Sequence, residues 1–265
     1  MSSDLPARPC LLAFDTSTEQ LALALVAPTG VFTHRAAGGA LASAHLLPQA
    51  FALLQQAGLA MSSVQAVAFG RGPGAFTGLR TSCAVAQGLA FGLACPVLPL
   101  DSLLLVAEDA FATNQTAART AARPAGHAAA QGGEDGADWT IAMDARMDEA
   151  YAARYRRVAG HWQVVEAPAL YTLPALAEAW ARCPPARVAG SALLAFAGRL
   201  PFPPAAVCLA QEANRAAALA SLALAAWSAG GAVDPASALP VYLRDKVALT
   251  TDERAAVRDA ARAAP

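Results

Sequence analysis

Residues 64–94 read VQAVAFGRGPGAFTGLRTSCAVAQGLAFGLA, and this stretch predicts a strand, a glycine-rich loop and a helix in succession. The apolar run 64–69 has the length and composition of a buried strand. Residues 70–78 contain four glycines and one proline, and residues 79–94 are rich in alanine and leucine. Because glycine lets backbone N–H groups converge and a helix N-terminus carries partial positive charge, such a loop can hold an anion.

The spacing of this loop matches neither common phosphate-binding fingerprint. A P-loop ends in Gly-Lys-Ser or Gly-Lys-Thr, whereas Gly78 is followed by Leu79. A dinucleotide-binding loop needs G-x-G-x-x-G, but Gly72, Gly74 and Gly78 are spaced G-x-G-x-x-x-G. The loop is therefore either a turn with special backbone angles or an anion cradle, and its spacing leaves both interpretations open.

Small residues follow one face of the predicted helix, where Thr81, Ala84, Gly88 and Gly92 recur at helical spacing. An interior glycine costs about 1 kcal/mol relative to alanine, so some compensating contact is expected. Close approach of another backbone is the usual reason. That backbone belongs either to the chain's own domain or to a helix of a partner.

Composition limits the classes of protein that this chain can represent. Its 265 residues suit one large domain or two small ones, and the net charge of −1 argues against an autonomous nucleic-acid binder. The five cysteines are scattered without any C-x-x-C pair, which is typical of reduced thiols. Neither a signal peptide nor a membrane-spanning run is evident, so we expect a cytoplasmic chain without membrane association.

A second polar motif follows the first predicted strand, residues 10–14. Asp15, Thr16, Ser17 and Thr18 lie between this strand and the next, residues 21–26. Hydroxyl groups and turn N–H groups can donate to a phosphate, and a carboxylate can address its cation. The same residues also suit an ordinary hydrogen-bonded turn. The motif alone does not decide between the two.

The order of elements suggests two related α/β halves with a cleft between them. The predicted units are a first half over 9–112, a low-complexity insertion or linker over 113–138, a second half over 139–245 and a tail over 246–265. A helix over 44–57 lies in the first half, and the last helix, about 211–229, is expected to pack back on that half. Both halves open on a strand that ends in aspartate, at Asp15 and Asp144.

Four motifs in this order resemble the bacterial TsaB family: residues 15–18, residues 70–80, residues 144–147 followed by Glu149 and Tyr151, and residues 240–244. The resemblance covers about residues 10 to 245, and it departs from the usual pattern at Ala75 and Ala150. It implies an α/β fold of two halves like those of actin, sugar kinases and heat-shock proteins (ASKHA).

TsaB is similar to TsaD, the catalytic subunit that makes threonylcarbamoyladenosine next to the anticodon of tRNAs. The two histidines that hold the metal of TsaD correspond to Ser102 and Val106, and valine cannot coordinate a metal. The resemblance therefore implies a chain with no catalytic residue and no metal, which serves as a partner or scaffold of TsaD together with TsaE. It implies that tRNA is contacted only through TsaD, and that ATP or ADP is bound only in the complex with TsaD and TsaE.

Two sets of residues are predicted to carry function. A vestigial nucleotide or phosphate cleft is predicted from eight residues: Asp15, Thr16, Ser17, Thr18, Gly72, Gly74, Thr77 and Gly78. The resemblance implies that the helices 44–57 and 77–94 pack against the matching pair of TsaD, and that a homodimer in isolation can use the same face. The predicted interface residues are Leu46, Gln49, Ala50, Leu53, Thr81, Ala84, Gly88 and Gly92, with Leu47, Phe51 and Leu54 as core.

Two other classes of function were weighed against this scaffold. One is an ATPase or small-molecule kinase of the same superfamily, which would use the Asp15 turn and the glycine loop as its phosphate site. The other is a metallopeptidase. The four histidines, His34, His45, His127 and His161, show no metal-ligand spacing, which argues against the second alternative.

Overall fold

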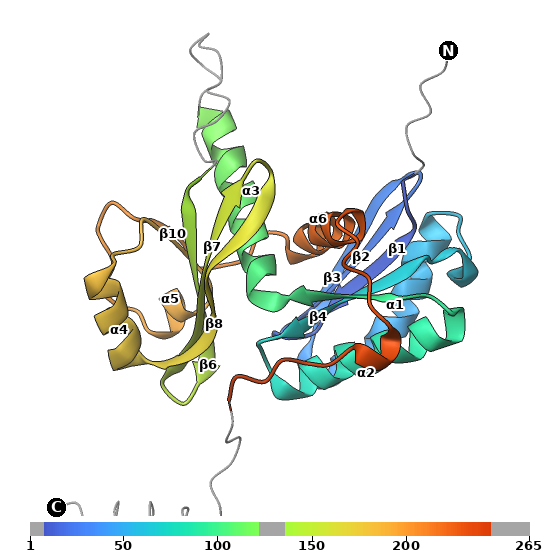
Figure 1. The fold of residues 1–265 in the computed structure, drawn as a ribbon, viewed down its shortest axis with the longest axis horizontal. Helices are drawn as coiled ribbons and strands as arrows, with labels where there is room; N and C mark the ends of the chain where they lie inside the picture. Colours follow the sequence, from blue (N-terminus) through green and yellow to red (C-terminus); the bar gives the residue numbers. More distant parts are fainter. Residues whose placement is uncertain (1–7, 122–135, 245–265) are drawn as a thin grey trace, which may run out of the picture.

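The apolar run near the N-terminus forms the central strand of a five-stranded sheet in the computed structural model, which describes residues 8–121 and 136–244. β1 (Leu11–Asp15) is buried throughout, pairs antiparallel with β2 (Gln20–Ala27) and runs parallel to β4 (Ala66–Gly72). The order is β3-β2-β1-β4-β5, with β3 (Gly30–Ala37) and β5 (Val97–Asp101) at the edges. This sheet is the centre of the first lobe (Figure 1).

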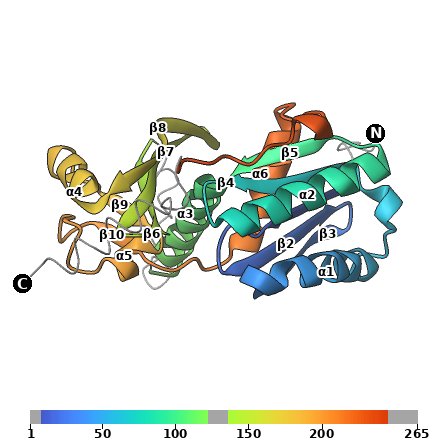
Figure 2. The same ribbon diagram turned by 90° about the horizontal axis from the view of Figure 1, so that it is seen from below.

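Helices cover both faces of this first sheet, which explains why its central strands are apolar without alternation. α1 (Ala42–Gln56) and α2 (Phe76–Leu93) lie side by side on one face, as Figure 2 shows. Leu12 and Phe14 point into the core under these helices, whereas Leu11 and Ala13 belong to the core on the opposite face. That opposite face is covered by α6 (Arg215–Ser228).

The second lobe contains a five-stranded sheet of order β10-β9-β6-β7-β8. Its strands are β6 (Asp138–Arg146), β7 (Glu149–Val158), β8 (His161–Thr172), β9 (Arg187–Ala189) and β10 (Val207–Leu209). α4 (Leu173–Arg182) and α5 (Ala192–Ala195) pack on one face. The Thr172 hydroxyl accepts a hydrogen bond from the Ala175 N–H and so caps α4.

Each lobe contributes one helix that packs against the sheet of the other lobe. α3 (Ser102–Ala121) begins directly after β5 of the first sheet, yet its apolar side packs on the second sheet against Trp139, Ile141 and Tyr155. α6 follows the second lobe in sequence and packs on the first sheet. Figure 1 shows α3 running between the two lobes.

The last described segment bridges the lobes. It directly follows the 3₁₀-helix η3 (Pro235–Ser237). The 3₁₀-helices η1 (Gly39–Leu41) and η2 (Met61–Ser63) lie before and after α1. The Val241 N–H donates to the Arg71 carbonyl of the first lobe at 2.7 Å. Arg244 forms an ion pair with Glu149 of the second lobe at 2.5 Å. This segment therefore fastens the first lobe to the second.

The structure corrects several predicted boundaries. α3 continues to Ala121, so the predicted insertion 113–138 begins inside a helix, and β6 already starts at Asp138. α3 stays helical because alanine and other good helix formers continue beyond its buried part. β8 and β10 were not predicted. Residues 122–135, with His127, and the predicted tail 246–265 lie outside the described residues.

Candidate functional site

The turn after β1 lies at the inner end of the first sheet and is closed by its own hydrogen bonds. Asp15 is completely buried, and its Oδ1 accepts from the Ser17 N–H at 2.8 Å and from the Ser17 hydroxyl at 2.7 Å. Its Oδ2 accepts from the Ser102 hydroxyl at 2.8 Å, and that hydroxyl accepts from the Gly72 N–H at 3.1 Å. Strand β1, the glycine loop and the start of α3 therefore meet at one carboxylate.

The side chain of the neighbouring Thr16 also forms hydrogen bonds within the protein. Its hydroxyl donates to the Gly78 carbonyl at 2.6 Å and lies 2.7 Å from the Ser82 hydroxyl. Thr18 at the edge of the turn exchanges hydrogen bonds only with Gln20. The hydroxyls of the predicted phosphate turn are thus engaged with protein atoms.

The glycines of the loop are required for close packing against this turn. A Cβ atom at Gly70 would overlap the Asp15 carboxylate, and one at Gly78 would overlap the Thr16 carbonyl oxygen. At Gly74 it would lie 2.6 Å from the Ser17 side chain. The loop therefore wraps the turn directly, with backbone against backbone.

Gly72 and Thr77 complete the predicted cleft set. Gly72 has φ +111°, a backbone conformation that favours glycine, and this supports the interpretation of the loop as a turn with special backbone angles. Thr77 lies at the exposed start of α2, where its carbonyl accepts from the Thr81 hydroxyl at 3.1 Å. Of the eight predicted cleft residues, Thr18 and Thr77 stand at the margin of the packed cluster.

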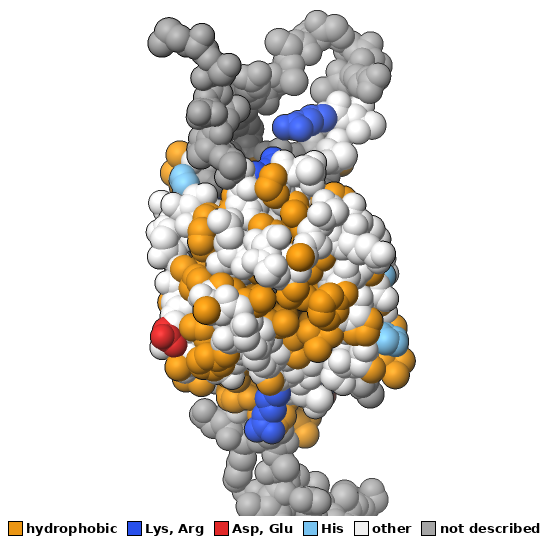
Figure 3. Space-filling model, turned by 90° about the vertical axis from the view of Figure 1, so that its right-hand side faces the viewer, with side chains coloured by type: hydrophobic (Ala, Val, Ile, Leu, Met, Phe, Trp, Pro, Cys, Tyr) orange, Lys and Arg blue, Asp and Glu red, His pale blue; other side chains and the backbone are white. Residues whose placement is uncertain are grey.

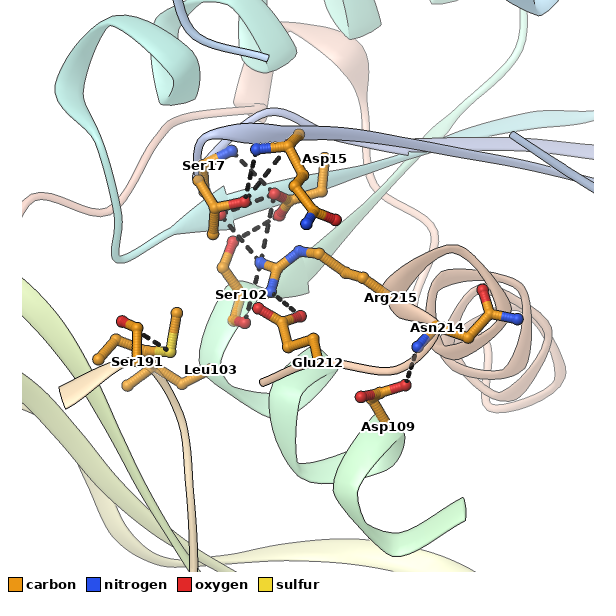
Figure 4. A network of polar contacts seen from close by, with 12 residues as sticks. Asp15, Ser17, Ser102, Leu103, Asp109, Ser191, Glu212, Asn214 and Arg215 are labelled. Atoms are coloured by element: carbon orange, nitrogen blue, oxygen red, sulfur yellow. Dashed lines mark hydrogen bonds and ion pairs between the residues drawn. The ribbon is translucent and has the colours of Figure 1, made fainter. Parts of the chain in front are cut away.

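The carboxylate of Asp15 faces an arginine that sequence reasoning did not single out. Arg215, the first residue of α6, is 2% exposed, and its Nη2 lies 3.3 Å from Asp15 Oδ1. The same guanidinium contacts the Ser17 hydroxyl at 3.0 Å, the Ser102 carbonyl at 3.3 Å and the Glu212 carboxylate at 2.6 Å (Figure 4). Burial lowers the pKa of Arg215, but the charges of Asp15 and Glu212 outweigh it, and the pKa is raised.

One signal in the sequence points to Arg215. A cation in the first turn of a helix opposes the helix dipole, so a basic residue that begins an alanine- and leucine-rich helix needs another reason to be there. The Asp15 carboxylate is that reason, although nothing in the sequence indicates which of the twenty acidic residues is the partner.

The second lobe has a related turn around Asp144. Its carboxylate accepts from the Arg146 N–H at 2.8 Å, and its N–H donates to the Ser191 hydroxyl at 3.0 Å. Gly190 has φ +123°, and a Cβ there would overlap the Ala142 carbonyl. Arg146 also pairs with Glu19 of the first lobe at 2.5 Å. The two aspartate turns are thus part of the contact between the lobes.

The predicted small-residue face of α2 points outward. Thr81 is partly buried, whereas Ala84, Gly88 and Gly92 are exposed, and a Cβ at Gly88 or Gly92 would meet no atom within 4 Å. Phe91 on the same side is 61% exposed. Among residues 8–121 and 136–244, nothing compensates for the helix-weakening effect of these two glycines.

The predicted face of α1 is wrong. Leu46, Ala50 and Leu53 belong to the core under the first sheet, and Gln49 is partly buried. Two residues predicted as core lie outside instead: Leu47 is 37% and Phe51 is 54% exposed. Both sets recur at helical spacing one residue apart, and the observed phase also buries Ala42 and Leu54, so it encloses more apolar surface.

The outward sides of α1 and α2 carry exposed apolar side chains and two exposed glycines. Figure 2 shows the two helices side by side in front of the sheet, and Figure 3, seen from the right-hand side of Figure 1, shows hydrophobic side chains and few charged ones at that end of the lobe. We call the outward side of the two helices the α1–α2 face and define it by six exposed residues: Leu47, Phe51, Ala84, Gly88, Phe91 and Gly92.

Metal-ligating side chains do not gather in the described part of the chain, where no group of three or more His, Cys, Asp or Glu residues could hold an ion. The two positions expected to correspond to metal ligands in TsaD have other partners. Ser102 bonds to Asp15, and Val106 is buried against the second sheet. Within residues 8–121 and 136–244, no helix combines the length and apolar character needed to cross a membrane.

Comparison with known proteins agrees with this geometry. A family model described as "TsaD: tRNA N6-adenosine threonylcarbamoyltransferase" matches residues 40–124. Two solved structures from Pseudomonas aeruginosa, one titled YeaZ and one described as similar to peptidase YeaZ, are 35% and 36% identical to the chain. Each superposes with a TM-score of 0.73, over 89% of this chain and 100% of theirs.

Two sequence relatives carry the name "tRNA threonylcarbamoyladenosine biosynthesis protein TsaB". The protein from Haemophilus influenzae is 37% identical over 148 residues, and that from Escherichia coli is 33% identical over 147 residues. These alignments cover 56% of this chain and 54% and 55% of the two relatives, so the chain spans about half their length.

The paired sheets, the aspartate turn at the inner end of each and the exchanged helices define an α/β protein of the ASKHA class. Within that class, the full-length match to YeaZ, which is another name for TsaB, decides the family. The chain belongs to the TsaB family.

Proposed function

We propose that the chain is a non-catalytic partner subunit of TsaD, acting with TsaE in the formation of threonylcarbamoyladenosine next to the anticodon of tRNAs. The α1–α2 face carries this proposal. It exposes two aromatic rings and two glycines at which an added Cβ would meet no atom within 4 Å. An apolar face of this kind marks a protein-binding surface more often than a free one.

The geometry of α2 suits a helix as the partner element. Glycine at positions 88 and 92 lets a second helix approach to about 8 Å, the near end of normal helix packing. Phe51 of α1 and Phe91 of α2 are exposed and can supply the buried aromatic anchors typical of interfaces. The segment that matches the TsaD family model, residues 40–124, contains both helices, which supports a pairing of like with like.

The same face would also let the chain associate with itself in the absence of the partner. A related pair of helices in a second copy would offer the same aromatic and small residues, and a two-fold interface needs only such self-complementarity. We therefore propose that TsaD competes with a homodimer of this chain, in the cytoplasm, and that tRNA is reached only through TsaD.

The buried polar cluster supports a role without catalysis. An ATPase or kinase of this fold would need Asp15 free to address a cation, whereas Asp15 is completely buried and paired with Arg215. Val106 cannot act as a metal ligand, and the Ser102 hydroxyl is engaged with Asp15. We therefore propose that ATP or ADP is bound only in the complex with TsaD and TsaE.

Substitution of the exposed glycine tests the proposal. Gly88→Arg should abolish co-purification with the cognate TsaD, because it places a long charged side chain in the centre of the apolar strip. Ala225→Arg is the matched control, since Ala225 is an exposed small residue on α6, which packs on the opposite face of the sheet. Undiminished binding by a folded Gly88→Arg chain would contradict the proposal.

A further inference from the structure

Oxygen atoms from separate parts of the chain converge on the head group of Arg215. Asp15 Oδ1 and Ser17 Oγ come from the turn after β1, the Ser102 carbonyl from the start of α3, and Glu212 from the segment before α6 (Figure 4). Carboxylate, hydroxyl and carbonyl oxygens are the ligands that hard cations take in proteins. The cluster thus has the chemistry of a cation site.

Arg215 occupies this site, and the protein contacts it through the two terminal nitrogens of its guanidinium, Nη1 and Nη2. Nη1 contacts Glu212, and Nη2 contacts Asp15, Ser17 and the Ser102 carbonyl. Nε, by contrast, is buried and has no hydrogen-bond partner among the described residues. The N–H groups of the two terminal nitrogens therefore make all of these contacts, and the nitrogen that joins the head group to its side chain makes none.

We propose that these oxygens form a cation site that the chain fills with its own Arg215, so that Asp15 is closed to a cation from solution. Without the guanidinium, the buried Asp15 carboxylate and the partly buried Glu212 carboxylate lose their countercharge, and the site accepts a small external cation with N–H donors. The inference does not depend on a partner protein.

Occupancy of the site also ties the lobes together. Glu212 and Arg215 lie on the segment that returns from β10 of the second lobe to α6 on the first sheet. Arg215 fixes the end of this segment to β1 and α3. The Arg215 guanidinium thus holds the segment between β10 and α6 in position and also shields Asp15 from solvent.

Chemical rescue of Arg215→Ala in the full chain tests this inference. We expect guanidinium chloride, far below denaturing concentrations, to raise the melting temperature of this variant saturably. Tetramethylammonium chloride at equal ionic strength should not, because it has no N–H donor. The unchanged chain should show no such rise, because its site is full.

The double variant Asp15→Asn/Arg215→Ala should lose the guanidinium response, because it lacks the carboxylate that holds the ion. A folded Arg215→Ala chain that responds equally to both salts would overturn the inference. A measurement on the unchanged chain does not depend on folding of the variant: the ¹⁵N signals of the Arg215 guanidinium should stay unchanged when Mg²⁺ and ADP are added. A saturable shift of these signals would show that an external cation displaces Arg215.

Discussion

The Tyr155 hydroxyl on β7 of the second lobe donates a hydrogen bond of 2.6 Å to Asp101 at the end of β5 in the first lobe. The other carboxylate oxygen of Asp101 accepts from the Leu103 N–H at 2.8 Å and thereby caps α3. Burial raises the pKa of Asp101 and also that of Tyr155, which the neighbouring carboxylate raises further. One buried pair therefore fixes the helix between the lobes and the contact of the two sheets.

Tyr155→Phe should destabilise the chain, because it leaves the buried Asp101 oxygen without its donor. The expected loss of unfolding free energy is about 1–3 kcal/mol, measured by urea unfolding at neutral pH. The raised pKa of Tyr155 also predicts that stability falls as pH rises above the ordinary tyrosine value of 10.0, since the unfolded state then releases its proton first. The variant should lack this fall; an equal alkaline dependence in both chains would assign it to another group.

Asp101→Asn should change the dependence of stability on pH in the acid range. Because the pKa of Asp101 is raised in the folded state above 3.8, its contribution is fully present below that value and is lost as pH rises through the raised pKa. The unfolding free energy of the unchanged chain relative to the variant should therefore decrease as pH rises above 3.8. Parallel curves for the two chains would show that Asp101 has the same pKa folded and unfolded.

Gly70→Ala and Gly92→Ala should have opposite effects on stability. A Cβ at Gly70 overlaps the Asp15 carboxylate, so this change should cost at least about 2 kcal/mol, as overpacking of a dense core does. A Cβ at Gly92 enters open space in a helix and should stabilise the isolated chain by about 0.5–1 kcal/mol. Thermal unfolding of both variants measures the difference, and a neutral Gly70→Ala would contradict the packing of the loop on the turn.

Glu108→Gln should weaken the contact of α3 with the second lobe and with α6. The Glu108 carboxylate accepts from Arg157 at 2.5 Å, from the Trp162 indole at 2.7 Å and from the Ser221 hydroxyl at 2.6 Å. Removing its charge leaves Arg157 without its partner, at an expected cost of about 1–3 kcal/mol in urea unfolding. Glu178→Gln, in an exposed pair with Arg182, is the control and should change stability by less than about 0.5 kcal/mol. Equal effects would argue against the buried contact.

Much of the candidate site could be predicted from local sequence signals. The glycine loop, the Asp15 turn and the outward small residues of α2 each follow from short-range features: backbone freedom of glycine, polar residues at a strand end and helical spacing. The structure also explains why residues 70, 74 and 78 are glycines: each lies against the backbone or a side chain of the turn, where a Cβ would not fit.

Other parts depend on contacts far apart in the sequence. The free face of α1 was predicted wrongly because Leu46 and Leu47 each begin an apolar series, and only packing on the sheet selects one. The role of Arg215 depends on an aspartate two hundred residues away. β8 was missed because it is a mostly exposed edge strand, which lacks the alternation of a half-buried one.

A single reaction can compare the α1–α2 face with the polar cluster. We would measure threonylcarbamoyladenosine formed on tRNA by TsaD and TsaE from an added threonylcarbamoyl donor, with saturating amounts of the unchanged chain, Gly88→Arg or Ser17→Ala, after confirming that each is folded. We predict that Ser17→Ala supports modification like the unchanged chain and that Gly88→Arg supports none. Full modification with Gly88→Arg, or loss of modification with a folded Ser17→Ala chain that still binds TsaD, would contradict the account.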